Sequence, residues 1–291
     1  MARLRRAVRW LQPKKKDSAR VVAILAAYNE ERFIAGCLEH LFEQGVEAYL
    51  IDNCSTDRTV EIAERYLENG LIGIETFPRA EFHTWQLLLE RKEQLAATLE
   101  ADWFMHMDPD EIRLPPSSDR TLVQAFAEAE ARGYNAVNFM EFTFIPTQEA
   151  PDHDHPDFQQ TMRWYYPFLR RFPQRLNAWK RQSKKVDLAP SGGHRVQFPG
   201  LRMYPESFKM RHYIFLSVPH ALSKYLNRKH DPKALQRGWA RMRASLTPER
   251  IRLPSQKEMR PYVSDDELDP SDPLTQHLWF LPQEEKQPES S

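Results

Sequence analysis

The sequence predicts an α/β fold with a mainly parallel sheet flanked by helices, and three features of its first half indicate this fold. Continuous apolar runs suit strands that are buried on both faces. Amphipathic segments between these runs suit helices, at the spacing of βαβ units. Polar residues follow the runs, where such a sheet binds its ligands. With 291 residues, 41% of them hydrophobic, the chain can bury one large core.

The expected elements follow one another without long gaps as far as Pro146. Strands are expected within 21–31, 46–53, 71–78, 102–111 and 134–146. Helices are expected within 31–45, 57–70, 82–101 and 120–133. Gly45 and the Asn69-Gly70 pair stand where two of these helices should end, because such residues accept the backbone conformation that closes a helix.

Beyond Pro146 the regular alternation stops. Residues 147–210 are rich in proline, aromatic residues and arginine, so we expect long loops with short strands within 163–173 and 194–200. An apolar strand should follow His212, and basic helices are expected within 217–230 and 232–246. The rest of the chain is acidic and rich in proline, and its end has the composition of a disordered segment.

The formal net charge of zero conceals a strong segregation of charge along the chain. Residues 21–159 hold nine basic and 27 acidic side chains, a net of −18. Residues 160–243 hold 19 basic and three acidic side chains, a net of +16. Two such halves can offer a site for a cation that faces a site for an anion. The alternative is two surfaces that attract each other without any ligand.

Polar clusters end three of the expected strands: Tyr28-Asn29-Glu30, Asp52-Asn53 and Asp108-Pro109-Asp110-Glu111. No G-x-G-x-x-G motif and no P-loop are present, which argues against NAD-type dehydrogenases and P-loop NTPases. A divalent metal held by carboxylates can neutralise a diphosphate instead. An acidic surface turn would give the same letters, but the apolar run 103–105 places these acids at the end of a buried strand.

Three blocks of the sequence resemble the bacterial family-2 glycosyltransferases, which have the GT-A fold. The blocks are VVAILAAYNEE, YLIDNCSTDRTVEIA and ADWFMHMDPDE, in the order and spacing of that family. The resemblance implies transfer of a sugar from a nucleoside-diphosphate sugar to an acceptor hydroxyl, assisted by Mn²⁺ or Mg²⁺, with inversion at the anomeric carbon.

The resemblance also implies a GT-A-like mixed sheet with a basic loop-and-helix extension. The expected parts are a basic N-terminal arm (1–19), a nucleotide-sugar-binding core (20–145), an acceptor-side region of the same domain (146–246) and a proline-rich acidic tail (247–291).

The same resemblance assigns roles to single residues. The nucleotide would contact Ala27, Tyr28, Glu30, Asp52 and Asp108. The metal would be bound by Asp110 of the D-x-D motif and by His212, which matches a late histidine ligand of GT-A enzymes. Arg91 stands where the family often has a basic residue near the nucleotide, with a surface arginine as the alternative. Three crowded carboxylates should raise the pKa of at least one of them unless a cation neutralises them.

The catalytic base is open, because the Glu-Asp pair of many family members is absent between residues 135 and 215. Glu141, Asp152 and Asp154 are candidates for deprotonating the acceptor, against plain structural or surface roles. Lys224 and Arg228 lie four residues apart on one helix and can neutralise the departing diphosphate. His194 follows a flexible Ser-Gly-Gly turn and is either an acceptor-side residue or a core histidine.

Two other kinds of protein explain parts of the sequence. A nucleic-acid-binding protein would use the basic segment 160–243 for phosphate contacts, but it would leave the carboxylates at three strand ends unexplained. The intact D-x-D motif argues against a non-catalytic protein with a degenerate transferase fold. We therefore expect an enzyme whose partners are a nucleotide sugar and a glycan or lipid-linked acceptor, and not nucleic acid.

The sequence predicts a cytoplasmic protein, because it has no stretch of about 20 apolar residues and no signal-peptide core. The basic start, RRAVRWLQPKKK, could rest weakly on the inner face of an anionic membrane. A disordered arm, or one docked on the acidic half, is the alternative. Cys37 and Cys54 are expected to be small buried thiols.

Overall fold

The computed structural model describes residues 19–78, 85–225 and 246–280. Its first half alternates strand and helix as the sequence predicts. The elements are β1 (Val21–Ala27), α1 (Ile34–Glu43), β2 (Glu47–Asp52), α2 (Thr59–Glu64), β3 (Leu71–Thr76), α3 (Trp85–Thr98) and β4 (Trp103–Met107). The four strands are parallel and lie side by side in the order β3-β2-β1-β4. The helix expected within 57–70 is shorter, because the backbone turns after Glu64.

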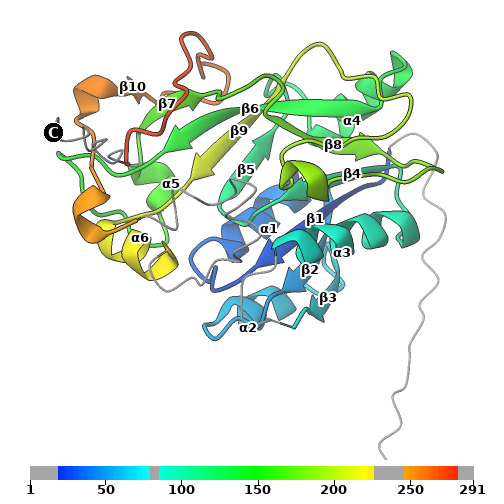
Figure 1. The fold of residues 1–291 in the computed structure, drawn as a ribbon, viewed down its shortest axis with the longest axis horizontal. Helices are drawn as coiled ribbons and strands as arrows, with labels where there is room; N and C mark the ends of the chain where they lie inside the picture. The colour runs from blue at the N-terminus through cyan, green and yellow to red at the C-terminus, as the bar shows by residue number, and fades with distance from the viewer. Residues whose placement is uncertain (1–18, 79–84, 226–245, 281–291) are drawn as a thin grey trace, which may run out of the picture.

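The second half extends the same sheet with mostly antiparallel strands. Its elements are β5 (Glu111–Leu114), α4 (Leu122–Ala131), β6 (Ala136–Phe144), α5 (Phe158–Thr161), β7 (Trp164–Phe168), β8 (Arg175–Lys180), β9 (Phe208–Tyr213), α6 (Val218–Tyr225) and β10 (Arg260–Pro261). The full strand order is β10-β7-β6-β8-β4-β1-β2-β3, and β9 pairs with both β5 and β6. Figure 1 shows β2 and β3 at one end of the molecule and β7 and β10 at the other.

Several expectations for the second half need correction. The strand expected within 102–111 ends at Met107, because Asp108 to Asp110 turn the chain before β5 begins. Residues 175–180, expected as a loop, form β8 against β4. The strand expected within 194–200 makes only isolated bridges. His212 lies inside β9 rather than before a strand. Apart from residues 19 and 246, the N-terminal arm and the helix expected within 232–246 lie outside the described residues, as do residues 283–291.

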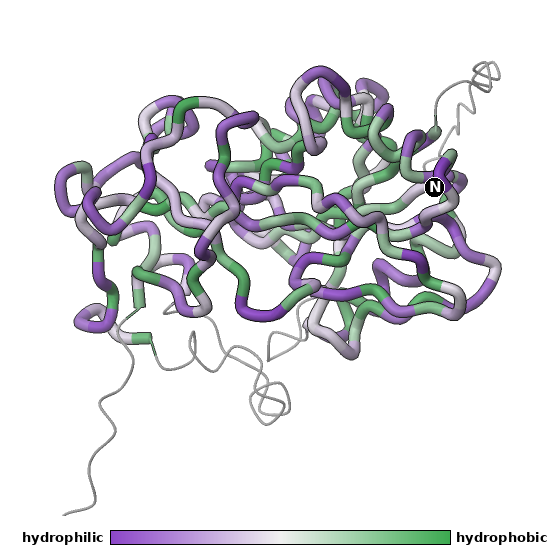
Figure 2. The backbone as a smooth tube through the Cα atoms, turned by 90° about the horizontal axis from the view of Figure 1, so that it is seen from above, coloured by the Kyte–Doolittle hydropathy of each residue, from purple (hydrophilic) through white to green (hydrophobic). Residues whose placement is uncertain are grey.

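The apolar run of β1 is buried on both faces of the sheet. Val21, Ala23 and Leu25 pack in a cluster with side chains of α1, α2 and α4. Val22 and Ile24 point the other way and pack in a second cluster with α3. Helices therefore cover both faces, as a continuous apolar strand requires. Figure 2 shows the hydrophobic stretches mainly toward the middle of the molecule and hydrophilic ones in peripheral loops.

Residues 246–280 pack against the β7 end of the sheet. Trp279 is 1% exposed and stacks on Tyr225 of α6 at 5.8 Å between ring centroids. Leu274 accepts a backbone hydrogen bond from Leu169, just after β7, and donates one to Pro167. This segment and the end of α6 thus share one apolar cluster. In the described part of the chain, no helix is both long and apolar enough to cross a membrane.

Candidate active site

The parallel strands bring their polar ends to one edge of the sheet. Ala27 and Asp52 are the last residues of β1 and β2 and pair in register. Asp108 directly follows β4, which flanks β1 on its other side. Asp52 is buried and accepts a hydrogen bond from the Ser55 backbone at 3.2 Å, while Tyr28 is half-buried beyond β1. Because ligands bind at the carboxyl ends of parallel strands, this edge is the candidate nucleotide site.

Asp110, in the turn after β4, is at the centre of a buried charge cluster. Its Oδ2 lies 2.8 Å from Lys224 Nζ of α6 and 3.7 Å from His212 Nε2 of β9. Lys224 Nζ also lies 3.3 Å from Glu30 Oε2. Burial opposes ionisation of Asp110, but Lys224 and His212 outweigh it and hold the pKa of Asp110 well below its ordinary value. The structure thus brings together four residues that are far apart in the sequence.

Glu141, expected as a base candidate, has a different environment. It is 1% exposed, and its Oε1 lies 2.6 Å from His212 Nδ1. Its Oε2 accepts hydrogen bonds from Arg175 Nε at 2.9 Å and from Gln174 at 3.0 Å. Burial opposes ionisation, but Arg175 and His212 outweigh it and lower the pKa of Glu141 well below its ordinary value. The structure thus joins Glu141 to His212 and Arg175 in one buried cluster.

The pKa of His212 follows from the same contacts. Burial lowers it, but Glu141 and Asp110 raise it to about 9. Without a metal the ring is therefore an imidazolium at neutral pH. Because Nδ1 donates to Glu141, the proton that a metal would displace is the one on Nε2, on the side of Asp110.

The remaining acids of the D-x-D turn form a second layer of the cluster. Glu111 Oε2 lies 2.6 Å from Arg113 NH2, and both side chains are almost fully buried. Arg113 in turn lies over the ring of Phe139 at 4.4 Å. Asp108 is different, because burial and then Glu111 raise its pKa. The crowding of carboxylates thus raises one pKa, as expected, while the cations compensate Asp110.

Two carboxylate oxygens stand out in this cluster. Within the described residues, Asp108 Oδ1 and Asp110 Oδ1 are buried and accept no hydrogen bond. No three His, Cys, Asp or Glu side chains of these residues come close enough together to hold a metal alone. Magnesium-type sites, however, often use one or two carboxylates and take further oxygens from substrate phosphates. Asp108 and Asp110 could supply two such carboxylates, although with His212 they do not form a complete three-residue metal site.

The other predicted residues lie around this centre. His194 is exposed in the turn after the 3-10 helix Ala189–Ser191, and its Nδ1 lies 3.2 Å from Arg175 NH1. Asp152 and Asp154 are exposed, and Asp154 pairs with Arg32 at 2.6 Å. Arg228 lies outside the described residues. Cys37 is buried and Cys54 half-buried.

Sequence reasoning missed two largely buried cations near the carboxylate cluster, Arg175 and Lys92. Arg175 joins Glu141 to His194, and Lys92 of α3 lies 2.7 Å from His106 Nδ1, beneath the D-x-D turn. A signal for Lys92 existed, because it falls among the apolar positions of its helix. For Arg175 there was none, because six of the eight residues before it are Pro, Arg or Phe, a composition for which we expected a loop.

Some solved structures of other proteins are similar to part of this chain. Two solved structures of TarS from S. aureus are similar to it. The structure of TarS residues 1–349 with UDP is 21% identical over 44% of this chain and 36% of that chain, with a TM-score of 0.31. Another of TarS 1–349 is 13% identical over 74% of this chain and 67% of that chain, with a TM-score of 0.38. This chain thus spans about a third of the first of these structures. No curated protein matches it.

A protein-family profile also matches this chain. The profile described as Glycosyl transferase family 2 matches residues 22–182, which is more than half of the chain. The matched part contains all four parallel strands and the D-x-D turn. The chain therefore belongs to glycosyltransferase family 2, and its mixed sheet with helices on both faces is a GT-A fold.

Proposed function

We propose that this protein transfers a sugar from a nucleoside-diphosphate sugar to an acceptor hydroxyl with inversion at the anomeric carbon. One observation carries the proposal: Asp108 Oδ1 and Asp110 Oδ1, in the turn after β4, are buried without a partner, while the other carboxylate oxygen of Asp110 contacts the cations Lys224 and His212. Partnerless buried carboxylate oxygens are costly unless something binds them. Membership of family 2 agrees with a nucleotide sugar as that ligand.

The donor would lie along the edge of the sheet. Ala27, Tyr28, Glu30, Asp52 and Asp108 would contact the base and ribose. Asp108, Asp110 and His212 would hold Mn²⁺ or Mg²⁺, which when bound offsets the charge of the leaving diphosphate. Glu141 keeps Nδ1 of His212 protonated, so that Nε2 is the nitrogen that turns to the cation. Lys224, at 2.8 Å from Asp110, stands where its ammonium can donate to a phosphate oxygen.

Asp152 and Asp154 are the preferred candidates for the base, because they are exposed whereas Glu141 is buried. Both lie in a loop that is tied to the donor site at two points. Asp154 accepts from Arg32 Nε at 2.6 Å, and Asp152 bridges to Ser217, which directly precedes α6. Either exposed carboxylate could take the proton of an acceptor hydroxyl as it attacks the sugar from the face opposite the diphosphate.

A thermal-shift panel tests this function. Nucleotide sugars and nucleoside diphosphates of uridine, guanosine, cytidine, adenosine and thymidine are added with Mn²⁺, with Mg²⁺ or with EDTA. At least one should raise the melting temperature, and more so with a metal, because a ligand that binds only the folded state stabilises it. The active nucleotide sugar should then release its nucleoside diphosphate in the presence of an acceptor. No shift with any nucleotide under any condition would contradict the proposal.

A further inference from the structure

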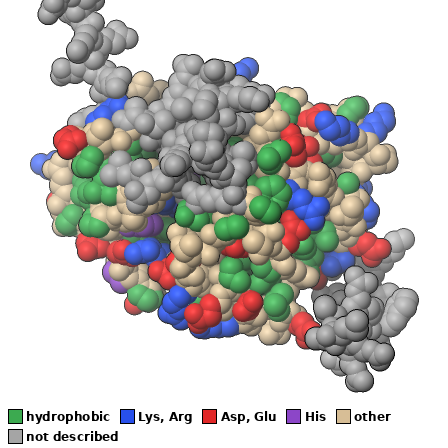
Figure 3. All heavy atoms as spheres, turned by 60° about the horizontal axis from the view of Figure 1, so that its bottom comes forward, with side chains coloured by type: hydrophobic (Ala, Val, Ile, Leu, Met, Phe, Trp, Pro, Cys, Tyr) green, Lys and Arg blue, Asp and Glu red, His purple; other side chains and the backbone are tan. Residues whose placement is uncertain are grey.

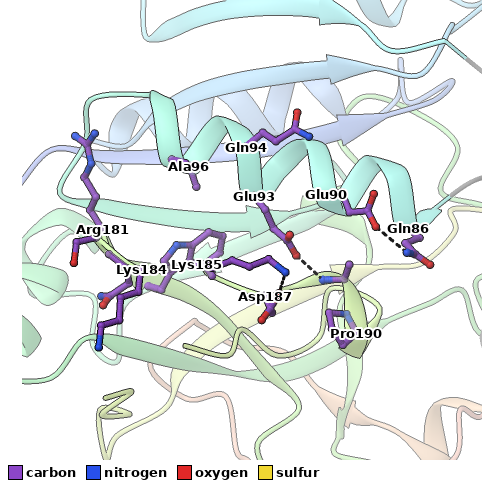
Figure 4. Close-up of a pocket in the computed structure, with 16 residues that line it drawn as sticks. Gln86, Glu90, Glu93, Gln94, Ala96, Arg181, Lys184, Lys185, Asp187 and Pro190 are labelled. Atoms are coloured by element: carbon purple, nitrogen blue, oxygen red, sulfur yellow. Dashed lines mark hydrogen bonds and ion pairs between the residues drawn. The ribbon is translucent and has the colours of Figure 1, made fainter. Parts of the chain in front are cut away.

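A long groove lies between α3 and the chain that follows β8. Its volume is about 1250 Å³, and residues 181–190 form the wall opposite the helix. Figure 4 shows the helix along one side and Arg181, Lys184, Lys185 and Asp187 on the other. Along α3 the lining runs from Gln86 to Ala97, about 16 Å at 1.5 Å per residue. This length suits a chain molecule better than a single small one.

The groove is a built feature, because its two walls are joined by hydrogen bonds. Glu93 of α3 accepts from the backbone N–H groups of Leu188 and Ala189 at 2.6 and 2.9 Å. On the opposite wall, Lys185 pairs with Asp187 at 2.5 Å. Figure 4 shows both contacts. Glu93 is thus used to hold the two walls together, and Glu90, one turn earlier on α3, accepts a hydrogen bond from the Gln86 amide at 2.7 Å.

The lining is mixed, because Ala96, Trp179 and Val186 contribute apolar surface beside amide, hydroxyl and charged side chains. It contains the amides Gln86, Gln94 and Gln182, the hydroxyl of Ser183 and the cations Arg181 and Lys184. None of the large hydrophobic side chains that are exposed on the described residues belongs to it. Side-chain amides both donate and accept hydrogen bonds, as do hydroxyl groups. A sugar ring, which carries hydroxyl groups on its edge and apolar C–H groups on its faces, matches this mixed lining.

One end of the groove lies next to the turn 191–194, which contacts β4. Pro190 lines the groove and precedes the Ser-Gly-Gly-His turn, which is fixed by Trp85 Nε1 donating to the Gly192 carbonyl at 2.9 Å. Gly193 has φ of +88°, and a Cβ there would lie 2.6 Å from His106 Nε2. The turn therefore rests directly on β4, two residues before Asp108. His194, next in the chain, is exposed at this end.

We propose that this groove binds the acceptor as a glycan chain. The reacting end of the glycan lies at the turn 191–194, and the chain behind it extends along α3 toward Ala97. This inference rests on the proposed function and adds to it the chemical class and the path of the acceptor. Neutral and acidic glycans share the hydroxyl groups that the amides recognise, and they differ in whether Arg181 and Lys184 contribute.

Ala97→Trp tests the groove, with Thr98→Trp as its matched control. Ala97 lines the groove and is exposed, so an indole there fills the far end without removing a buried contact. Thr98 is the next exposed residue of α3 and does not line the groove. The labelled proteins are applied, with UDP and Mn²⁺, to a printed array of neutral and acidic oligosaccharides of graded length. Ala97→Trp should lose at least tenfold in binding to the longer glycans, while Thr98→Trp should match the unmodified protein.

The array separates the sources of the ligand. Binding that persists at high salt on neutral glycans assigns recognition to the amides, and binding confined to acidic glycans and lost at high salt assigns it to Arg181 and Lys184. No binding by the unmodified protein, or equal binding by both variants, would overturn the groove. Thermal shifts with nucleotides, measured on the same samples, distinguish failure of the groove proposal from failure of the proposed function. If nucleotides stabilise the protein and glycans do not bind, only the groove is wrong.

Discussion

The two ends of the sheet handle charge in opposite ways. Around β1 to β3 the strands are apolar and ion pairs lie on the surface, as between Arg58 and Glu61, whose side chains are 61% and 56% exposed. Between β4 and β9 the pairs are buried, as between Arg113 and Glu111. Buried pairs add little net stability, because desolvation offsets their attraction. Their concentration beside the D-x-D turn therefore indicates a requirement of function.

The comparison also explains the segregation of charge along the chain. Lys224 and Arg175, from the basic segment, meet Glu30, Asp110 and Glu141, from the acidic one. Mutual attraction of the two segments thus explains much of the pattern without a ligand, but it leaves Asp108 Oδ1 and Asp110 Oδ1 without a partner. On the face drawn in Figure 3, exposed acidic and basic side chains are interspersed rather than gathered in separate blocks.

Glu141→Gln should have the largest effect on stability. The neutral amide leaves Arg175 and the imidazolium of His212 buried without their carboxylate, and breaking a buried pair costs about 3–5 kcal/mol. Denaturant unfolding measures this change. The metal should also bind about 10- to 100-fold more weakly, because His212 loses the partner that orients it. Titration of Mn²⁺ followed by electron paramagnetic resonance gives that value.

Glu61→Gln is the control for this comparison. Glu61 pairs with Arg58 and Arg65 on the surface, so its loss should leave the free energy of unfolding nearly unchanged. If Glu141→Gln were as stable as this control and bound Mn²⁺ normally, Glu141 would have no positioning role.

Asp110→Asn should have the largest effect on catalysis. The amide keeps the shape of the side chain but is a poor metal ligand, so transfer should fall by about 10²- to 10³-fold. Metal-dependent stabilisation by nucleotide should disappear with it. Some loss of stability is expected too, because Lys224 and His212 lose their shared carboxylate. Asp119→Asn, which removes an exposed acid paired with Arg120, should leave the transfer rate unchanged.

Lys224→Met should weaken donor binding by roughly tenfold or more, because a hydrogen bond to a charged group contributes about 1.5–3 kcal/mol. Calorimetric titration with the nucleoside diphosphate found in the panel measures this loss. The nucleoside itself, which has no phosphate, should bind both forms equally well. An equal loss for nucleoside and diphosphate would mean that Lys224 only supports α6 and the Glu30 side chain.

The sequence predicted the first end of the sheet well and the second end poorly. Local sequence patterns predict the βα units, because each strand is an apolar run and each helix has its own periodicity. β8 reads as a loop, because proline and arginine precede it and Asn177 interrupts its apolar residues. Its stability comes from β4 and β6, on either side, and from the long-range pair of Arg175 with Glu141. No local pattern reports such a pair.

The candidate site was likewise predicted only in part. Family resemblance named Asp110 and His212, helical spacing named Lys224, and the fold brings these three together. Glu141 was one of three base candidates, chosen for its place toward the end of a strand, and the structure shows it buried beside Arg175. Whether such a carboxylate faces solvent or a buried arginine depends on which strand becomes its neighbour, and sequence patterns gave no sign of β8 beside β6.

His220 should make the α6 end of the molecule sensitive to acid. Burial, and then Lys224, lower the pKa of His220 to about 3, and its Nδ1 accepts from the Leu216 backbone at 3.0 Å. The unfolded chain therefore binds a proton at pH values where the folded one does not. The neutral ring contributes fully above about pH 6.5, and stability should fall by about 1.4 kcal/mol for each pH unit below that value, toward pH 3. Urea unfolding at pH 7 and pH 5.5 measures the slope.

His220→Asn separates this titration from others. Asparagine keeps an acceptor near the Leu216 N–H but does not titrate, so the loss of stability between pH 7 and pH 5.5 should be smaller than in the unmodified protein. His155→Asn, at an exposed position, should keep the original slope. An unchanged slope in His220→Asn would assign the acid sensitivity to another group.

Arg91→Ala should have the smallest effect on stability and on nucleotide binding. It tests whether this arginine is a surface ion-pair partner or a nucleotide contact. The family resemblance places a basic residue near the nucleotide, but in the structure Arg91 pairs with Glu75 at 2.7 Å and its side chain is 33% exposed. A pair of this kind contributes about 0.2–1 kcal/mol. Glu75→Gln should therefore cost about as much stability as Arg91→Ala, and the double variant should cost less than the sum. Nucleotide affinity, measured by the calorimetry used for Lys224→Met, should stay within about twofold. A tenfold loss in Arg91→Ala, absent in Glu75→Gln, would show that the arginine leaves its surface partner for the donor.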